Sequence, residues 1–274
     1  MKKLIAMLLA LVMALSLAAC GSTAGNTTSD DTADSDTAAT ASDVQYIKDK
    51  GTLIVGITEF EPMDYQDENG QWIGFDADMA KLVAEKLGVE VQFQVINWDT
   101  KIEELDGKTI DCVWNGMTLT DAVMSAMECS NAYCNNAQVV ITKGALDAAD
   151  AASLTYAVEA GSAGEIAATE KGYKTVPVDT QAKALMEVDA GTADAAVIDL
   201  LMAGAMVGEG TSYPSLTVTD QQLTTELYGV GCRKGSDLAA FINDVLAAAY
   251  TDGTMQEIAT TYGVQESLVD QTAA

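Results

Sequence analysis

From Gly51 to Val89 the chain reads GTLIVGITEFEPMDYQDENGQWIGFDADMAKLVAEKLGV. The segment begins with a short apolar run, Thr52 to Ile57, which is ended by turn residues and therefore predicts a strand. An amphipathic helix should follow, because Asp76 can cap its start, Gly88 can end it, and its apolar side chains share one face. Those apolar positions are Met79, Leu82, Val83 and Leu87. A strand followed by such a helix is the first unit of an α/β fold.

The same alternation continues along the chain in two separate runs. The first run adds a strand at 89–95 in which apolar and polar residues alternate, a helix at about 99–105 and a strand at 109–114. The second run has strands at YAVEA from Thr155, at KTVPV near Thr175 and at 195–198, with a helix at 180–190. Strands that alternate with helices predict a mostly parallel sheet. Each run can form a sheet of its own, which would give two α/β lobes.

Two further apolar segments are candidates for strands that connect the lobes. They are Gln138 to Lys143 (QVVITK), between the two runs, and Tyr228 to Arg233 (YGVGCR), after them. We predict that one crosses from the first lobe to the second and the other crosses back. The segment from Ser236 to Tyr262 predicts two helices broken at Asp252-Gly253. Its core-facing positions are Leu238, Phe241, Ile242 and Val245.

The N-terminal segment has the pattern of a secretory signal. Two lysines precede an apolar run from Leu4 to Leu17, and Ala18-Ala19 stands before Cys20, which predicts a signal peptide over residues 1–19. The run is shorter than the ~20 residues that span a bilayer. Leu17-Ala18-Ala19-Cys20 resembles the bacterial lipobox, which implies a diacylglyceryl anchor on Cys20; an ordinary signal with an incidental cysteine is the alternative. Residues 20–43 are small and polar or acidic and predict a flexible tether.

Charge and composition exclude several classes of function. The chain has 14 basic and 41 acidic residues, no histidine and a single arginine, Arg233. A protein with this excess of acidic residues is a poor partner for nucleic acid or for anionic lipid. We therefore expect it to contact a membrane only through the anchor. The absence of histidine removes His-based metal sites and catalytic triads, and we predict neither a metal nor a cofactor.

The cysteines beyond Cys20 show no CxxC spacing and so give little support to a zinc site or a redox couple. They are Cys112, Cys129, Cys134 and Cys232. In an exported protein Cys129 and Cys134 could form a disulfide, but separation in sequence does not set the distance between them. Free thiols are the other possibility, and both remain open at this point.

Several segments together resemble the bacterial extracellular solute-binding proteins of the amino-acid type, family 3, which serve ATP-driven (ABC) importers. They are the Gly51 to Val89 stretch, WNGMTLT at Trp114 to Thr120, AVEAGSAGE around Gly161, GTADAAVIDL ending at Leu200, YGVGCRKGSDL, and TDGT at Thr251. The resemblance implies a two-lobed, type II periplasmic-binding-protein-like fold whose lobes are joined by two strands and close over a ligand. It places one lobe at 44–138 and 232–274 and the other at 139–231.

The resemblance also implies a partner and a location. We expect a monomer that delivers its solute to an ABC transporter permease. We expect it to be lipid-anchored on the extracytoplasmic side of a cell membrane, with the length of the tether favouring a Gram-positive surface.

The resemblance assigns roles at the cleft to particular residues. Phe60 and Trp98 match aromatic rings that sandwich the ligand, although both could instead be core residues. Gly116 and Thr118 match groups that bind the ligand's ammonium, and Asp199 matches the carboxylate that does so; its alternative role is to cap the following helix. Gly161 and Ser162 match donors to the ligand's carboxylate at a helix start. The predicted ligand-binding set is completed by Glu59, Asn115 and Tyr228.

One motif departs from the family pattern. The family usually reads T-x-E-R after this loop, and its arginine forms a forked pair with the ligand's carboxylate. Here Thr120-Asp121-Ala122 is followed by Val123, while Ala163 stands where a hydroxyl is common, and Lys101 is expected to be solvated. Either the ligand's carboxylate is bound by Gly161, Ser162 and helix amides alone, or the ligand is an amine or a neutral solute. The acidic residues near Phe60, namely Glu59, Glu61 and Asp64, favour a cationic ligand.

We therefore predict a binding protein and no enzymatic activity. Two alternatives remain on the same fold. One is an enzyme similar to cyclohexadienyl dehydratases, which needs a general acid and a site for its substrate's carboxylates. The other is a sensory or scaffold protein that reports occupancy of the cleft to a membrane partner.

Overall fold

A computed structural model describes residues 42–144 and 151–272 of the chain. The signal peptide, Cys20 and nearly all of the predicted tether lie outside these residues. Within the described part, no helix combines the length and the apolar content that a membrane span requires.

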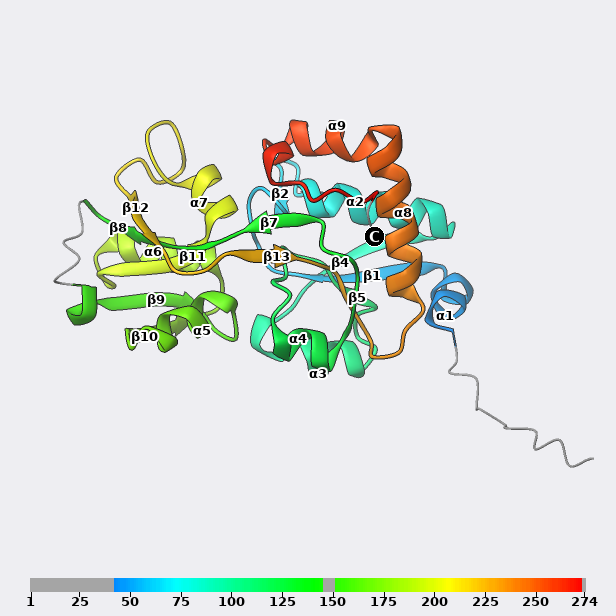
Figure 1. The fold of residues 1–274 in the computed structure, drawn as a ribbon, viewed down its shortest axis with the longest axis horizontal. Coiled ribbons are helices and arrows are strands. Elements are labelled where there is room, and N and C mark those ends of the chain that lie inside the picture. Colours follow the sequence, from blue (N-terminus) through cyan, green and yellow to red (C-terminus); the bar gives the residue numbers. More distant parts are fainter. Residues whose placement is uncertain (1–41, 145–150, 273–274) are drawn as a thin grey trace, which may run out of the picture. The chain divides into compact units, whose positions relative to one another are not determined.

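The first lobe is built on a five-stranded sheet with the order β4-β1-β5-β14-β6 (Figure 1). β1 pairs in parallel with β4 and β5, whereas β14 runs antiparallel to β5 and β6. Its strands are β1 (Thr52–Ile57), β4 (Glu90–Val95), β5 (Cys112–Val113), β6 (Glu128–Cys129) and β14 (Gly231–Cys232), with a hairpin of β2 (Tyr65–Gln66) and β3 (Trp72–Ile73). Its helices are α1 (Asp43–Lys50), α2 (Phe75–Leu87), α3 (Lys101–Asp106), α4 (Asp121–Ala126), α8 (Leu238–Asp252) and α9 (Thr254–Thr261), with 3-10 turns at Trp98–Thr100 and Gln265–Ser267.

The second lobe is built on a sheet with the order β10-β9-β11-β8-β12. β9 pairs in parallel with β10 and β11, and β8 runs antiparallel to β11 and β12. Its strands are β8 (Gln138–Thr142), β9 (Thr155–Glu159), β10 (Lys174–Val178), β11 (Ala195–Asp199) and β12 (Thr217–Gln222). Its helices are α5 (Ala163–Glu170), α6 (Gln181–Ala190) and α7 (Leu200–Met206), with a 3-10 turn at Ala151–Ser153. The prediction of a two-lobed α/β fold is thus confirmed.

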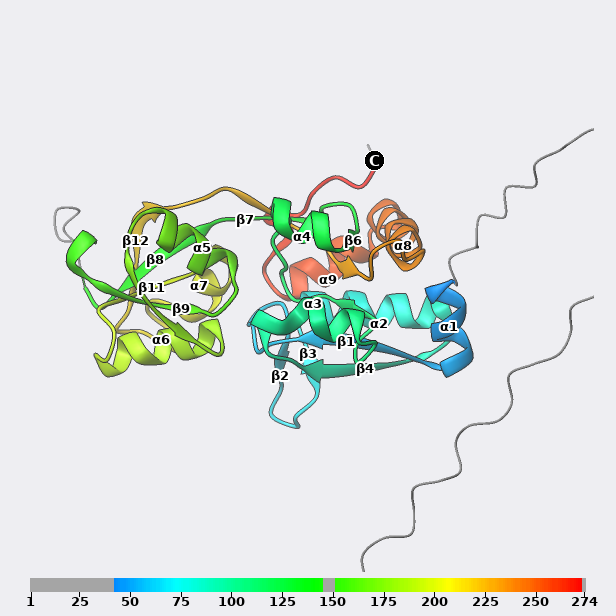
Figure 2. The same ribbon diagram turned by 90° about the horizontal axis from the view of Figure 1, so that it is seen from below.

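The two connecting strands differ from those predicted. β7 (Cys134–Asn136) and β13 (Glu226–Tyr228) form an antiparallel pair that runs between the two sheets (Figures 1 and 2). Gln138 to Thr142 is instead a fully buried strand inside the second sheet, and Gly231–Cys232 lies inside the first. The prediction chose the two most apolar runs, but strong apolarity is typical of a strand that has sheet neighbours on both sides. The strands that connect the lobes are more polar. The predicted lobe boundaries, 44–138 with 232–274 and 139–231, stay a prediction.

The start of α2 corrects another prediction. Its N-cap is Gly74, and Asp76 lies within the first turn with its side chain fully buried. Gly74 has φ +122°, and a Cβ there would lie 2.2 Å from the Met63 carbonyl oxygen, so glycine is required at this close approach. The Asp76 carboxylate instead accepts hydrogen bonds from the Gly116 N–H (2.6 Å) and the Tyr133 hydroxyl (2.7 Å). It therefore holds the loop that follows β5.

The other elements agree more closely with the sequence. The C-terminal helices are broken at Gly253, which adopts φ +89° between α8 and α9. The buried face of α2 includes Met79, Val83 and Leu87, each worth about 1.5–3 kcal/mol of burial. Cys129 and Cys134 are free thiols, as are Cys112 and Cys232.

The N-terminal end of the described chain is fastened to the first lobe. Ser42 and Asp43, the last two residues of the predicted tether, are already part of the fold, because Ser42 caps α1 and Asp43 is buried. The Arg233 guanidinium pairs with Asp43 at 2.9 Å. The Ser42 hydroxyl and the Val44 N–H both donate to Asp237, the residue before α8.

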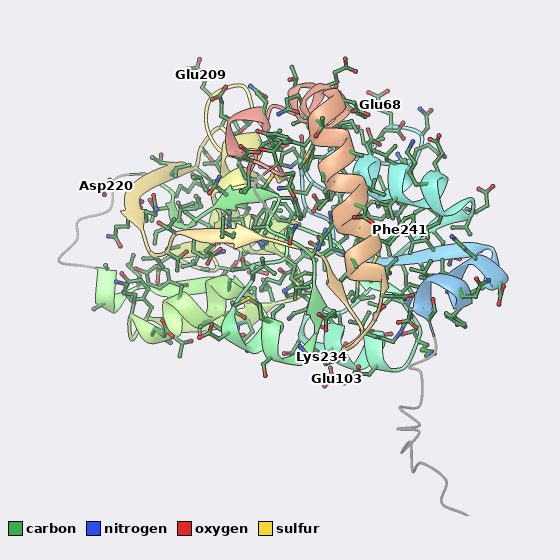
Figure 3. All side chains as sticks on the ribbon, turned by 45° about the vertical axis from the view of Figure 1, so that its right-hand side comes forward. Glu68, Glu103, Glu209, Asp220, Lys234 and Phe241 are labelled. Carbon is green, nitrogen blue, oxygen red and sulfur yellow. The ribbon has the colours of Figure 1, made fainter. Side chains whose placement is uncertain are left out.

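Many of the acidic residues are on the surface. Figure 3 shows the exposed carboxylates of Glu68, Glu103, Glu209 and Asp220 at the periphery of the molecule. The carboxylates that matter below are the exceptions, since they are buried.

Candidate functional site

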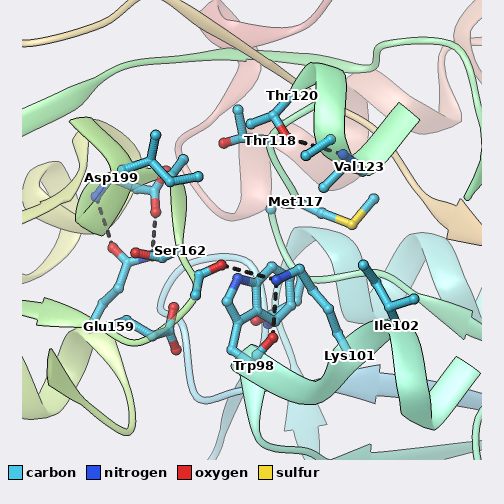
Figure 4. A pocket seen from close by; sticks show the side chains of 17 residues that line it. Trp98, Lys101, Ile102, Met117, Thr118, Thr120, Val123, Glu159, Ser162 and Asp199 are labelled. Carbon is cyan, nitrogen blue, oxygen red and sulfur yellow. Dashed lines mark hydrogen bonds between the residues drawn. The ribbon is translucent and has the colours of Figure 1, made fainter. Parts of the chain in front are cut away.

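A cleft of about 120 Å³ is lined by residues from both lobes, and it has room for a solute of on the order of ten heavy atoms (Figure 4). From the first lobe its lining includes Trp98, Lys101, Ile102, Asn115, Gly116, Met117, Thr118, Thr120, Ala122 and Val123. From the second lobe it includes Glu159, Gly161, Ser162, Ala163, Ile166, Gln181 and Asp199.

Seven of the ten predicted ligand-binding residues line this cleft. They are Trp98, Asn115, Gly116, Thr118, Gly161, Ser162 and Asp199. The other three do not: Glu59 is exposed, whereas Phe60 and Tyr228 are buried. The ligand-binding role of these three residues stays a prediction. The surroundings of Phe60 and Tyr228 indicate a structural role for their rings.

Phe60 and Tyr228 lie directly behind Gly116. Their rings meet edge to face with centroids 6.4 Å apart. A Cβ on Gly116 would come within 2.6 Å of the Phe60 ring and 3.0 Å of the Tyr228 ring. Gly116 also has φ +54°, so both its conformation and its neighbours require glycine. The two rings therefore support the loop that borders the cleft.

Asn115 and Thr118 fix the same loop through their side chains. The Asn115 oxygen accepts from the Thr58 N–H (3.0 Å), and its amide nitrogen donates to Asp64 (2.8 Å). The Thr118 hydroxyl donates to Glu226 on the connecting strand β13 at 2.9 Å. The loop is thus positioned by hydrogen bonds from several parts of the fold.

Asp199, at the end of β11, is the most heavily hydrogen-bonded carboxylate of the cleft. Its oxygens accept from Tyr228 (2.7 Å), Gln138 (2.9 Å), Asn136 and Gln181. Its side chain makes no capping bond to α7, so the alternative role as a helix cap is not what the structure shows. Burial, and then the nearby Glu226 carboxylate, raise the pKa of Asp199 to about 7. Asn136 and Gln138 also donate to Glu226 and so hold the two carboxylates together.

Glu159 is a cleft residue that the sequence reasoning missed. It ends β9 next to β11, is 3% exposed, and its Oε1 has no hydrogen-bond partner among the described residues. Burial, and then the Asp199 carboxylate, raise the pKa of Glu159 to about 8. The rule that drew attention to Asp199, an acid at the carboxyl end of a buried strand, applies equally to Glu159 and would have found it.

Lys101 contradicts the expectation of a solvated lysine. It is 7% exposed, and its ammonium donates to the carbonyl oxygens of Trp98 and Gly161, both at 3.0 Å. The second of these bonds joins α3 of the first lobe to the second lobe. The ammonium also lies 4.9 Å from the centre of the Trp98 ring. Burial lowers the pKa of Lys101, although the nearby carboxylates of Glu159 and Asp99 oppose the shift.

The predicted seat for a ligand carboxylate, at the start of α5, is already used by the protein. The Gly161 N–H donates to the Glu165 carboxylate at 2.8 Å, and the Ser162 hydroxyl accepts from the Glu165 N–H at 3.1 Å. These reciprocal bonds form a variant of the capping box, in which Glu165 accepts from the N–H of the residue before the N-cap, so the helix start binds a carboxylate of its own.

Val123, which stands at the position of the family's arginine, lines the cleft, and the described lining contains no arginine elsewhere. Val123 is 8% exposed on α4. The chain's one arginine, Arg233, is bound to Asp43, to the Ile110 carbonyl (2.8 Å) and to Asp111, away from the cleft lining. Lys101 is thus the one basic side chain in the described lining of the cleft.

Two lobes, two connecting strands and a polar cleft between them define a two-lobed solute-binding protein. The chain belongs to the bacterial extracellular solute-binding proteins, family 3, whose sequence profile matches residues 53–265. It is similar to the L-cystine-binding protein TcyJ of Escherichia coli K12, with 29% identity over 221 residues that cover 77% of this chain and 82% of that protein.

Two solved structures extend the comparison. A substrate-binding protein of an ABC uptake transporter from Streptococcus pneumoniae, with bound histidine, is 29% identical, has a TM-score of 0.73 and covers 81% of this chain and 96% of its own. AncCDT-1, an ancestral amino acid-binding protein described as a precursor of cyclohexadienyl dehydratase, is 32% identical with a TM-score of 0.71 and covers 81% and 99%.

Proposed function

We propose that this chain is the substrate-binding component of an ABC importer and captures an amino acid or a related small polar solute in the cleft between its lobes. The observation that carries the proposal is Asp199, a buried carboxylate at the cleft that is oriented by a network of donors from both connecting strands and the second sheet. Membership of the family supports the transport role. The relatives that bind L-cystine and histidine support a ligand of amino-acid size.

The proposal extends to how the protein is placed and what it contacts. Cleavage before Cys20 and lipid attachment there would hold a monomer on the extracytoplasmic face, with a Gram-positive surface favoured, and the folded lobes would deliver solute to a permease. The motif around Cys20 supports this part of the proposal. Mass spectrometry of Cys20 and sedimentation of the purified protein test it.

A thermal-shift screen of the purified protein tests the binding function. Amino acids, amines, dipeptides and other small polar solutes would be added one at a time. A ligand at a hundred times its Kd stabilises the folded state by roughly 2.7 kcal/mol, which is a rise of a few degrees in Tm for a protein of this size. A screen in which no solute raises the Tm would contradict the proposal.

An enzymatic function on the same scaffold is the second candidate, and two observations favour it. AncCDT-1 is described as a precursor of a dehydratase. Glu159, with its pKa raised to about 8, is protonated at neutral pH, as a general acid must be. Its substrate's carboxylates, however, would meet only Lys101 in the described lining. A spectrophotometric assay with prephenate and arogenate distinguishes this function from simple binding.

A further inference from the structure

The charges of the cleft favour a cation over a zwitterion. The described lining holds two carboxylates, Glu159 and Asp199, and one ammonium, Lys101. A third carboxylate, Glu226, shares its donors with Asp199 just behind the lining. Because the pKa values of Glu159 and Asp199 are raised to about 8 and about 7, both groups release their protons readily near pH 8, where the cleft gains an excess of negative charge that an added cation would balance.

The place where a ligand carboxylate could bind carries a negative charge already. The Gly161 N–H and the Ser162 hydroxyl are both engaged with Glu165, so the carboxylate of Glu165 sits at the N-terminus of α5. The Ser162 N–H is also engaged, with the Glu159 carbonyl at 3.2 Å. A second carboxylate at this helix start would be repelled by Glu165.

The cleft's ammonium is also committed. Lys101 donates to two backbone carbonyls (Figure 4), and the Glu159 carboxylate is the charge that does most to oppose the lowering of its pKa by burial. Val123, on the other side of the cleft lining, offers only methyl groups. Nothing in the described lining presents a forked pair of donors to a carboxylate.

In contrast, one hydrogen-bond acceptor of the cleft has no donor in the described part of the structure. Glu159 Oε1 is buried and has no hydrogen-bond partner among the described residues. Buried carboxylate oxygens are almost always paired, and an unpaired one at a cleft indicates a missing N–H or O–H group. Asp199, beside it, provides a second carboxylate for the same ligand.

We propose that the ligand is a small organic cation that carries ammonium or guanidinium groups and no carboxylate, and that Glu159 and Asp199 accept its N–H groups. This inference rests on the proposed function, because it names the class of solute for the same cleft. It assigns Glu159 a specificity-determining role. On this proposal, the cleft discriminates against amino acids because its described lining has no free group to bind their carboxylate.

Three pairs of probes test the inference, since the members of each pair differ only by an α-carboxylate. They are agmatine and arginine, cadaverine and lysine, and putrescine and ornithine. Calorimetric titration of the full chain at pH 8, in a mild detergent, should give the amine a Kd at least tenfold lower than its amino acid in one or more pairs. Equal or tighter binding of the amino acids overturns the inference and leaves the proposed function in place.

The remaining outcomes separate the two proposals. If none of the six probes binds while a neutral or acidic solute raises the Tm, the inference is wrong and the solute-binding function stands. If no solute of any class binds, both are wrong.

Variants identify the residues responsible. Glu159→Gln should weaken the binding of agmatine at least tenfold, while Glu170→Gln, which removes the same charge from the exposed end of α5, should change it less than twofold. Glu165→Gln keeps the capping box but removes its charge, and should improve the binding of arginine about fivefold or more with little effect on agmatine. Unchanged agmatine binding in Glu159→Gln overturns the role of Glu159.

Discussion

Replacing Gly161 by alanine tests whether ligand binding depends on the close approach of the two lobes. A Cβ at this position would lie 2.8 Å from the Asp99 Cα in the first lobe and 2.7 Å from its carboxylate oxygen. The side chain of Asp99 can turn away, but its backbone cannot. In the same structure the Gly161 carbonyl accepts the 3.0 Å bond from Lys101. The substitution therefore acts where the first residue of α3 is bonded to the loop that precedes α5.

The expected loss follows from these distances. Ordinary carbon contacts begin near 3.4 Å, so the two backbones must separate by about 0.6 Å from the present 2.8 Å. The same movement lengthens the Lys101 bond from 3.0 Å beyond hydrogen-bonding distance. Losing a bond from a charged donor costs about 1.5–3 kcal/mol. At 1.4 kcal/mol per factor of ten, binding should weaken by about 10- to 150-fold.

A matched variant separates this effect from backbone strain. Gly161 has φ +70°, and Gly191, at the end of α6 in the same lobe, has φ +74° with nothing within 4 Å of its added Cβ. Alanine at either position carries a left-handed strain of about 1–2 kcal/mol, so the lowered Tm of Gly191→Ala measures that strain alone, and any further fall in Gly161→Ala measures the lost contact between the lobes. Only Gly161→Ala should lose affinity. Calorimetric titration with the best solute from the screen measures both Kd values, and equal affinities would refute the reasoning.

Three further predictions concern the cleft. The pKa values of Glu159 and Asp199 are raised to about 8 and about 7, so their contribution to the stability of the empty protein is complete below about pH 4 and is lost as the pH rises through 7 and 8. Melting curves should therefore show the Tm of the empty protein falling between about pH 4 and pH 8. Titrations over the same range should show the affinity for a cationic probe rising by up to tenfold per pH unit. Val123→Arg adds a guanidinium to the lining and should reverse the preference for agmatine over arginine, whereas Val123→Met should not, which competition titrations check. Tyr228→Phe removes one donor to Asp199 and should lower stability by about 1 kcal/mol while weakening binding only a few-fold; a hundredfold loss in the titration would instead place Tyr228 against the ligand.

The order of strands and helices was predictable because it depends on local patterns. The run at Thr52–Ile57 and the helix broken at Gly253 needed only apolar periodicity and a glycine that can adopt positive φ. Asp199 was predictable for a similar reason, since an acid that ends a buried strand lies at the carboxyl end of the sheet, where α/β proteins bind ligands.

The features that the sequence did not reveal depend on distant partners. Lys101 was expected in solvent, and its burial comes from the Gly161 carbonyl, 60 positions away in the chain. Asp76 was expected to cap α2, but its partners Gly116 and Tyr133 reach it from other elements. Local pattern cannot specify such contacts, because the chain must first fold to bring these groups together.

The fastening of α1 to the first lobe has a mechanical consequence. A pull on the chain from upstream of Ser42 would enter the fold at α1 and pass through Asp43 to Arg233 and through Ser42 and Val44 to Asp237. Both receiving residues belong to the first lobe, between β14 and α8. The first lobe would therefore bear the force, which would not be transmitted through β7 or β13. Tension on the N-terminal end of the fold would thus not restrain rotation of the second lobe about these two strands.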